Sequence, residues 1–313
     1  MMKNKVKVAI VQGNPVQVDL QAALQQTLEW IEAAAGKGAD LVVFGETWLT
    51  GYPVWLDYCP GMAVWDHEPT KEVFTWMHQN GVEVPGPVTD TLGALARKHQ
   101  LTLVIGVNEV IRSGPGQGTM YNSLLIFNEK GELANHHRKL MPTYTEKLLH
   151  GMGDGHGLKT VDTTFGKLGA LICWEHWMPL TRQALHESGE HIHIALWPKV
   201  HELHQVASRH YAFEGRCFVI AVGQIIRVKD LPEALTVSAE LKDQPDRLLL
   251  NGGSCVIGPD GHYLLPPQFD QIGIIMVEID QLDRLIGERM TLDTTGHYNR
   301  RDVFDLTINK ERK

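Results

Sequence analysis

The sequence predicts one α/β or α+β domain in which two layered β-sheets are covered by helices. Short apolar runs that are typical of buried strands alternate along the chain with segments of helical periodicity. No linker rich in Pro, Ser or Gly, no low-complexity segment and no internal repeat divides the 313 residues. With 43% apolar residues, a chain of this length can bury roughly three quarters of its unfolded surface, so one core is sufficient.

The first half of the chain alternates strand and helix patterns. Asp19 is a candidate N-cap, and the apolar residues after it recur at helical spacing as far as Gly36. The run Leu41-Val42-Val43-Phe44 is continuous, as in a strand that is buried on both faces. The expected elements are strands at residues 6–12, 41–44 and 101–107, helices at residues 20–35 and about 90–99, and a hairpin of strands 121–127 and 132–139.

The second half repeats this style. The expected strands cover residues 166–173, 191–197, 217–222, 253–257 and 273–279, and the expected helices cover residues 179–188 and 206–215. A turn is expected at residues 258–261 and a surface loop at residues 112–118. We expect the domain to occupy residues 1–288 and an extended tail, docked on a neighbouring subunit, to occupy residues 289–313.

The composition excludes several partners. Lys+Arg number 29 and Asp+Glu number 37, which gives a net charge of −8 without a long basic run, so a nucleic-acid partner is not expected. No apolar run approaches the length of about 18 residues that a membrane span needs, and the run at residues 8–11 is too short for a signal peptide. Four cysteines without a CxxC spacing favour free thiols in a reducing compartment, so a cytoplasmic protein is expected.

Three strand ends carry residues that are suited to catalysis. Glu46 follows the buried strand at residues 41–44, where open α/β sheets place their active sites. Cys173 stands between an apolar strand and a helix start, where nearby backbone N–H groups lower a thiol pKa and suit an oxyanion. Lys139 ends the run His136-His137-Arg138-Lys139, and Glu146 follows seven residues later. Taken singly, these residues also fit a capping glutamate, an inert buried cysteine and a solvated basic patch.

The three motifs together resemble the Glu–Lys–Cys triad of the nitrilase superfamily of carbon–nitrogen hydrolases. They occur in the family's order, and the resemblance extends from Val6 to about Leu306. The sequence from Cys173 to Pro179 is similar to the CWE-x-x-x-P pattern of members that cleave nitriles, and the glycine-rich stretch at residues 151–157 also resembles this branch. The resemblance implies an αββα sandwich. Gly45 departs from the family, in which proline often precedes the glutamate.

The resemblance implies hydrolysis of an organic nitrile to a carboxylic acid and ammonia without a cofactor. Cys173 is then the nucleophile that forms a thioimidate and later a thioester, and Glu46 is the base. Lys139 and the backbone N–H of Trp174 stabilise developing charge, and Glu146 orients Lys139 or positions substrate and water. An amidase, a cyanide-hydrolysing member of the superfamily and a catalytically silent assembly scaffold are the alternatives.

An aromatic pocket for the substrate is expected around Tyr52, Trp174, Trp197 and Pro198, which leaves aryl, arylalkyl and aliphatic nitriles open. No metal site is expected, because no cysteine or carboxylate pattern completes a zinc set with the histidines at positions 191, 193, 201, 204 and 210.

The resemblance also implies homo-oligomers, either dimers or larger spiral assemblies. The tail contains Tyr298, Val303, Phe304 and Leu306, which would form an exposed apolar strip on a monomer. Burial of this strip against a second subunit is expected, and folding of the tail onto its own domain is the alternative.

Overall fold

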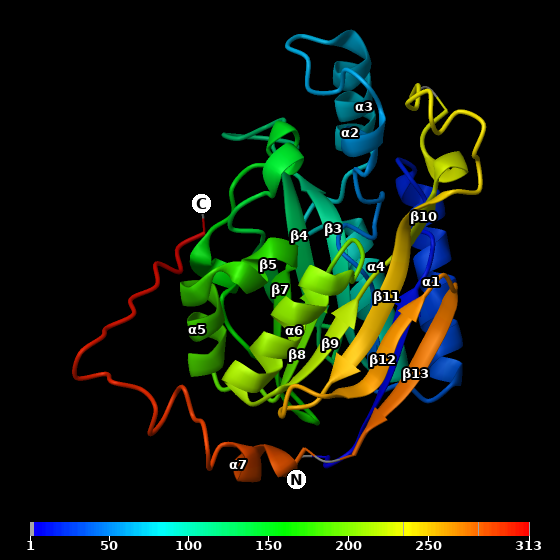
Figure 1. Cartoon of the computed structure of the whole chain (residues 1–313). Coiled ribbons are helices and arrows are strands. Elements are labelled where there is room, and N and C mark those ends of the chain that lie inside the picture. Colours follow the sequence, from blue (N-terminus) through cyan, green and yellow to red (C-terminus); the bar gives the residue numbers. More distant parts are fainter. Residues whose placement is uncertain (1–2, 234, 281, 313) are drawn as a thin grey trace.

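The computed structural model describes residues 3–233, 235–280 and 282–312. The expected domain at 1–288 therefore has residues 1, 2, 234 and 281 outside the described residues, and the expected tail at 289–313 has residue 313 outside them. Figure 1 shows two β-sheets packed face to face with helices on their outer sides. This arrangement confirms the predicted sandwich of helix, sheet, sheet and helix layers.

The first sheet has the strand order β13-β1-β2-β3-β4-β5 within the described residues. Its strands are β1 (Val6–Gln12), β2 (Leu41–Val43), β3 (Thr102–Val110), β4 (Met120–Phe127), β5 (Leu133–Arg138) and β13 (Gly273–Ile279). β1, β2 and β3 are parallel, whereas β4 pairs antiparallel with both β3 and β5. β5 therefore runs in the same direction as β2, and their carboxyl ends lie at the same edge.

The second sheet has the order β10-β11-β9-β8-β7-β6, with β12 paired to β11. Its strands are β6 (Val161–Thr163), β7 (Gly166–Ile172), β8 (Ile192–Leu196), β9 (Phe218–Val222), β10 (Ile225–Arg227), β11 (Leu248–Ile257) and β12 (Tyr263–Phe269). The central strands β7, β8 and β9 are parallel. Their carboxyl ends also lie at a common edge, which is where the site residues occur.

Two helices cover each sheet. α1 (Leu20–Gly36) and α4 (Pro87–His99) pack on the first sheet, and α5 (Pro179–Glu187) and α6 (Glu202–Gly215) pack on the second. The Asp19 side chain accepts the N–H of Ala22, which confirms the predicted N-cap of α1. The remaining helices are α2 (Trp55–Tyr58), α3 (Glu68–Gln79) and α7 (Arg284–Glu288), and short 3-10 helices include η1 (Tyr144–Leu148) and η3 (Cys173–Trp177).

The apolar core has one layer between the sheets and one under each helix pair. β2 shows why its sequence is continuously apolar: Leu41 and Val43 face the inter-sheet layer, whereas Val42 packs with Ile31 of α1 on the outer side. All three side chains are fully buried. The prediction of a strand buried on both faces is confirmed.

Several elements were not predicted: α2, α3, α7, β6, β10 and β12 have no counterpart among the expected helices and strands, and α6 and β11 begin at Glu202 and Leu248, before the expected starts at residues 206 and 253. α2 and α3 form a projection above the sheets in Figure 1, in a segment where no helix was expected. Half of the residues of α3 are exposed, and Val73 and Met77 are its buried residues. They recur at helical spacing, so the segment is an amphipathic helix that the sequence analysis overlooked. The strand β12 was also missed, because Pro266 and Pro267 argue against a strand; it is an edge strand, where proline is tolerated.

Among the described residues, the helices lack the length and apolar character that crossing a membrane requires.

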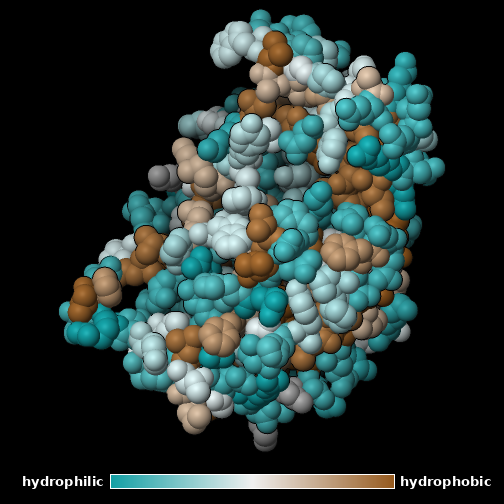
Figure 2. Space-filling view, viewed as in Figure 1, coloured by the Kyte–Doolittle hydropathy of each residue, from teal (hydrophilic) through white to brown (hydrophobic). Residues whose placement is uncertain are grey.

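The tail leaves the sandwich after α7 and forms the projecting loop at the left of Figure 1. Tyr298, Val303 and Phe304 are exposed on it, and Figure 2 shows hydrophobic side chains along this projection. Near its end the tail returns to its own domain, where the Arg312 guanidinium lies 3.3 Å from the Asp154 carboxylate and also donates to the carbonyl of His136.

Candidate active site

The structure brings together Glu46, Lys139, Glu146 and Cys173, which the sequence places in separate segments. Glu46 lies just beyond β2, Lys139 follows β5 directly, and Cys173 follows β7 directly. Acidic or thiol atoms of Glu46, Glu146 and Cys173 all lie within 4.8 Å of one another, and all four side chains are buried. The directions of the strands explain why these residues lie close together, since the carboxyl ends of β2, β5 and β7 lie near one another.

The Lys139 ammonium connects the two carboxylates. Its Nζ donates to Glu46 Oε1 at 2.8 Å and to the Oε1 and Oε2 atoms of Glu146 at 3.0 and 2.7 Å. Lys139 is 1% exposed, and the preceding residues His137 and Arg138 are also buried. The alternative of a solvated basic patch is therefore wrong for these three residues, because each lies on a buried strand end opposite an acidic partner.

Other polar groups orient the carboxylates. Asn122 of β4 donates to Glu46 Oε1 at 2.7 Å. Tyr52 donates its hydroxyl to Glu146 Oε1 at 3.0 Å, and the backbone N–H of Thr143 donates to Glu146 Oε2. Glu46 Oε2 is buried and has no hydrogen-bond partner among the described residues. One oxygen of Glu46 is thus fixed by Lys139 and Asn122, and the other is available to accept a proton.

The two carboxylates have different proton affinities. Burial raises the pKa of Glu46 to about 7, although the nearby Lys139 ammonium lowers it. Burial also raises the pKa of Glu146, but Lys139 and the Thr143 N–H outweigh this and hold it below its ordinary value. For Lys139, burial lowers the pKa and the two carboxylates raise it well above its ordinary value. The arrangement is therefore an ammonium ion, an ionised Glu146, and a Glu46 that can exchange protons near neutral pH.

The protonation of Cys173 is set by two opposing influences on the pKa of its thiol. The expected lowering of its pKa by neighbouring backbone N–H groups is present, since the N–H of Trp174 lowers it. Burial has a larger effect in the opposite direction and, with the carboxylate charge of Glu46, raises the pKa of the thiol well above its ordinary value. The thiol is therefore protonated at rest and needs a base, which is the role that the resemblance implies for Glu46.

The backbone at Cys173 has a φ of +51°, in the left-handed region that is uncommon for residues other than glycine. This conformation costs about 1–2 kcal/mol, and it turns the chain sharply from β7 into η3. The sharp turn places the thiol at the strand end, near Glu46 and Glu146.

Glu175 joins the Lys139 and Cys173 strand ends, a role that the sequence reasoning missed. One of its oxygens accepts the N–H of Leu140, the residue after Lys139, and the other accepts the N–H of Ile172, the residue before Cys173, both at 2.8 Å. His137 of β5 also contacts both oxygens, at 3.0 and 2.9 Å. Asn122 was missed as well. Glu175 belongs to the CWE-x-x-x-P pattern, which named it without giving it a role, whereas the signal for Asn122 was a polar side chain within an apolar strand pattern.

Gly45, the departure from the family pattern, has a spatial reason. A Cβ atom at this position would lie 2.5 Å from Cγ of Gln224, and no larger residue fits without displacing that side chain. Gln224 donates its amide N–H to the carbonyl of Glu46. The glycine-rich stretch lies beside the site as expected, since Gly153 donates its N–H to the carbonyl of Lys139 at 2.9 Å.

The four residues expected around the substrate occupy different environments. The Tyr52 hydroxyl lies in the cluster, on Glu146, and Trp174 is 47% exposed next to the nucleophile. Trp197 is fully buried in the core beneath α6, where its indole N–H donates to Ser208 and its ring stacks on His204. Pro198 is buried and accepts the N–H of Gln224. No contact given by the structure joins the Trp197 ring to Glu46, Lys139 or Cys173 among the described residues.

Glu46, Glu146 and Cys173 also form the one grouping of acidic, thiol or imidazole atoms among the described residues that is close enough to hold a metal ion. The Lys139 ammonium already forms ion pairs with both carboxylates, so a positively charged group already occupies the position between Glu46 and Glu146.

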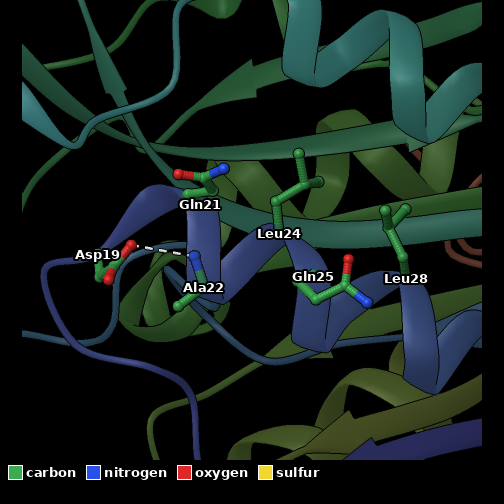
Figure 3. Close-up of a pocket in the computed structure, with 6 residues that line it drawn as sticks. All are labelled: Asp19, Gln21, Ala22, Leu24, Gln25 and Leu28. Atoms are coloured by element: carbon green, nitrogen blue, oxygen red, sulfur yellow. Dashed lines mark hydrogen bonds between the residues drawn. The ribbon is translucent and has the colours of Figure 1, made fainter.

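The shallow pocket in Figure 3 lies elsewhere, along α1, and has a volume of about 520 Å³. Its one ionisable lining residue, Asp19, caps the helix. This pocket offers no nucleophile or base.

Comparison with known proteins agrees with the geometry. The model of the carbon–nitrogen hydrolase family matches residues 7–284. An aliphatic nitrilase of Sinorhizobium fredii is 37% identical over 309 residues, covering 99% of this chain and 97% of that protein. A bifunctional nitrilase/nitrile hydratase of Oryza sativa is also 37% identical, covering 98% of this chain and 84% of that protein. The solved structure of Saccharomyces cerevisiae Nit3, a member of branch 10 of the nitrilase superfamily, shares the fold, with a TM-score of 0.70 at 22% identity over 96% of this chain and 98% of that one. The chain therefore belongs to the carbon–nitrogen hydrolase family.

Proposed function

We propose that this carbon–nitrogen hydrolase converts an organic nitrile to the carboxylic acid and ammonia, with Cys173 as the nucleophile. The observation that carries the proposal is the buried Glu46–Lys139–Cys173 cluster, in which Glu46 has a pKa of about 7 and a free oxygen. The relatives named aliphatic nitrilase and bifunctional nitrilase/nitrile hydratase support the choice of a nitrile as substrate.

In the first half of the reaction, Glu46 Oε2 accepts the proton of the Cys173 thiol. The sulfur then attacks the nitrile carbon, and the proton passes to the nitrile nitrogen, which gives a thioimidate. Lys139 stabilises the charge that develops on nitrogen, assisted by the N–H of Trp174. The buried Lys139 suits this role because the two carboxylates keep it protonated.

In the second half, Glu46 takes a proton from a water molecule that adds to the thioimidate carbon. Glu46 returns this proton to the nitrogen, so the tetrahedral intermediate carries a hydroxyl and an amino group. Transfer of the hydroxyl proton to the nitrogen then breaks the carbon–nitrogen bond, which releases ammonia and leaves a thioester. A second water, activated in the same way, releases the acid and restores the thiol. Glu146 stays ionised and keeps Lys139 in place. If the carbon–sulfur bond of the tetrahedral intermediate breaks first, the product is the amide.

The test is a panel of aryl, arylalkyl and aliphatic nitriles, with cyanide and the matching amides included. Ammonia, acid and amide are measured for the wild type, Cys173→Ser and Cys217→Ala. Cys217 is a matched control because it is also buried and free but lies at the start of β9, away from the cluster. We expect turnover of a nitrile by the wild type and Cys217→Ala and none by Cys173→Ser. A folded Cys173→Ser variant that retains turnover would exclude the mechanism, and turnover of amides alone would favour an amidase.

We also propose that the protein works in the cytoplasm as a homo-oligomer whose subunits bury the tail strip of Tyr298, Val303 and Phe304. The four free, buried cysteines fit a reducing compartment. The three strip side chains are 66%, 57% and 73% exposed in the single chain, which is costly for apolar groups of this size.

A further inference from the structure

A chain of buried hydrogen bonds leads from Glu190 through His193 and His176 to the backbone of Cys173. His176 Nδ1 lies 2.7 Å from the carbonyl oxygen of Cys173, and His176 Nε2 lies 3.0 Å from Nε2 of His193. His193 Nδ1 lies 2.8 Å from a carboxylate oxygen of Glu190. All three side chains are buried, and none of them has a role in the reaction described above.

The proton positions along this chain of hydrogen bonds follow from the partners. A carbonyl oxygen accepts hydrogen bonds and cannot donate, so Nδ1 of His176 carries a proton. Burial lowers the pKa of His176 and of His193. Burial raises the pKa of Glu190, but the two histidines beside this carboxyl hold its pKa at about 2, so the imidazoles of His176 and His193 are neutral and Glu190 is ionised. A neutral His193 carries one proton, which it donates either to Glu190 or to Nε2 of His176. When His176 accepts this hydrogen bond, its own Nδ1–H becomes a stronger donor to the Cys173 carbonyl.

The carbonyl that His176 contacts belongs to the same peptide group as the N–H of Trp174. That N–H faces the Cys173 sulfur and lowers its pKa. A hydrogen bond to the oxygen of a peptide group draws electron density toward the oxygen and strengthens the N–H at the other end; in chains of hydrogen bonds this strengthening amounts to about 10–30% per bond.

We propose that His176, held by His193 and Glu190, is a positioning residue that strengthens the Trp174 N–H as a donor to the Cys173 sulfur and to the charge that develops during attack. This inference rests on the proposed function for its role in turnover. The effect on the thiol itself does not depend on the substrate.

Neighbouring residues hold the hydrogen-bonded side chains of Glu190, His193 and His176 in position. Tyr211 of α6 and His186 of α5 both bond the second oxygen of Glu190, at 2.6 and 2.9 Å. A Cβ atom at position 169 would lie 2.1 Å from Glu190, so Gly169 is required for this carboxylate to reach His193. The ionisable groups that act on the two imidazoles are Glu190 and His186, with His204 and Tyr211 from α6 and Glu175 from η3.

Two substitutions of His176 separate the parts of this proposal. His176→Asn places an amide N–H near the position of Nδ1, so it keeps the donor to Cys173 and loses the contact with His193. His176→Leu removes both. His191→Asn is the matched control, because His191 precedes β8 and bonds the backbone N–H of Lys167 at the opposite end of the same strands. Thermal unfolding of each variant measures any loss of structure.

The first measurement is alkylation of Cys173 by iodoacetamide as a function of pH, read by peptide mass spectrometry. This measurement needs no nitrile. We expect the alkylation curve to move to higher pH in His176→Leu, to move by a smaller amount in His176→Asn, and to stay unchanged in His191→Asn.

The second measurement is turnover of a nitrile that the wild type hydrolyses. We expect kcat to fall about 10–100-fold in His176→Leu and about 3–10-fold in His176→Asn, with a small change in KM. These losses are smaller than the loss of about 10²–10³-fold that removal of a direct oxyanion donor causes, because His176 acts through the Trp174 N–H.

A folded His176→Leu variant with the wild-type alkylation curve and kcat would overturn the proposal. A wild-type alkylation curve in His176→Asn would also overturn it, since that variant lacks the link to His193, and it decides the matter if His176→Leu does not fold. A wild type that is alkylated at Cys173 but hydrolyses no nitrile would contradict the proposed function, and the alkylation curves would still test His176.

Discussion

Glu46 and Glu146 contact the same ammonium group and yet hold their protons differently. Burial dominates at Glu46, which has one oxygen without a partner, and raises its pKa to about 7. Glu146 accepts hydrogen bonds from Lys139, Tyr52 and a backbone N–H, and its pKa is lowered. Enzymes assign acid–base roles to paired carboxylates in this way, so the environment rather than the residue type favours Glu46 over Glu146 as the base that we propose.

The first prediction is that kcat/KM for a nitrile rises with pH through about 7. Glu46 must be ionised to accept the thiol proton, and below its pKa it is protonated, so the rate falls on the acid side.

Glu46→Gln is expected to fold and to lose at least about 10²-fold in kcat, because an amide cannot take the proton. Lys139→Arg is also expected to fail, since the larger guanidinium does not fit the site of a compact ammonium. A pH profile without an acid limb near 7, or near-wild-type rates in either variant, would show that the roles are misassigned.

The second prediction concerns the pair Gly45 and Gln224. Gly45→Ala is expected to lower both turnover and the free energy of unfolding, because its Cβ would meet Gln224 at 2.5 Å and shift the backbone beside Glu46. Combining it with Gln224→Ala removes the clash, so the two changes are expected to couple by about 1–2 kcal/mol in a double-mutant cycle measured by urea unfolding. Additive effects of the two substitutions would contradict this explanation of the glycine.

At the scale of elements, a buried ion pair ties β3 to β5 near the site. Glu109 of β3 accepts hydrogen bonds from Arg138 and contacts His136 at 2.7 Å, both on β5, and Ser123 of β4 also donates to it. Burial raises the pKa of Glu109, but these hydrogen-bond partners have the larger effect together and lower the pKa to about 2. Arg138 directly precedes Lys139, so this pair also holds the strand that positions the catalytic ammonium.

The third prediction is that Glu109→Gln lowers the free energy of unfolding by about 3–5 kcal/mol, because it leaves the buried Arg138 without its main acidic partner. We expect a loss of about 3 kcal/mol, because the carboxylate of Asp154 also stabilises the charge of Arg138. Because the pKa of Glu109 is lower in the folded state, its stabilising effect is complete above about pH 4.5 and is lost as the pH falls toward about 2. Urea unfolding at neutral and acid pH measures both effects. Glu278→Gln is the control, since its ion pair with Lys5 is exposed and little change is expected. Equal losses in the two variants would contradict the argument.

At the scale of the whole molecule, the two alternatives that the sequence left open concern different parts of the tail, and the structure shows only the docking on its own domain. Its end returns to its own domain, where Leu306 and Ile308 pack against the core and Arg312 lies near Asp154. Its middle part, with Tyr298, Val303 and Phe304, stays exposed beside α5. Own-domain docking therefore involves the end of the tail, and the exposed middle part is the surface that we propose a second subunit covers.

The fourth prediction is that deletion from Asp302 onward lowers the oligomer mass measured by light scattering and reduces activity. Two further variants separate the causes. Replacing Val303 and Phe304 by serine removes exposed apolar area and is expected to lower the mass alone, whereas Arg312→Ala loosens the contact with Asp154 and is expected to leave the mass unchanged. A truncated protein with the full-length mass and turnover would show that the tail plays no part in assembly.

The sequence by itself determined the elements that local patterns encode. The strand β1 has the bounds predicted from its β-branched run, Asp19 caps α1 as its position indicates, and β4 and β5 form the predicted hairpin. It also placed Glu46, Lys139 and Cys173 at strand ends, because the end of an apolar run is visible in a single segment. Their resemblance to a known triad supplied the family, which the comparisons confirmed.

The tertiary structure alone decided how these residues are charged and what holds them. Burial sets the raised pKa values of Glu46 and Cys173, and burial depends on the packing of two sheets, which no local pattern reports. Asn122 and Glu175 act on residues 76 and 35 positions away in the chain. Contacts over such separations form only when strands from different parts of the sequence meet. The motifs could therefore suggest Cys173 and Glu46 as a candidate nucleophile and base, but they could not show the network of contacts that positions these residues.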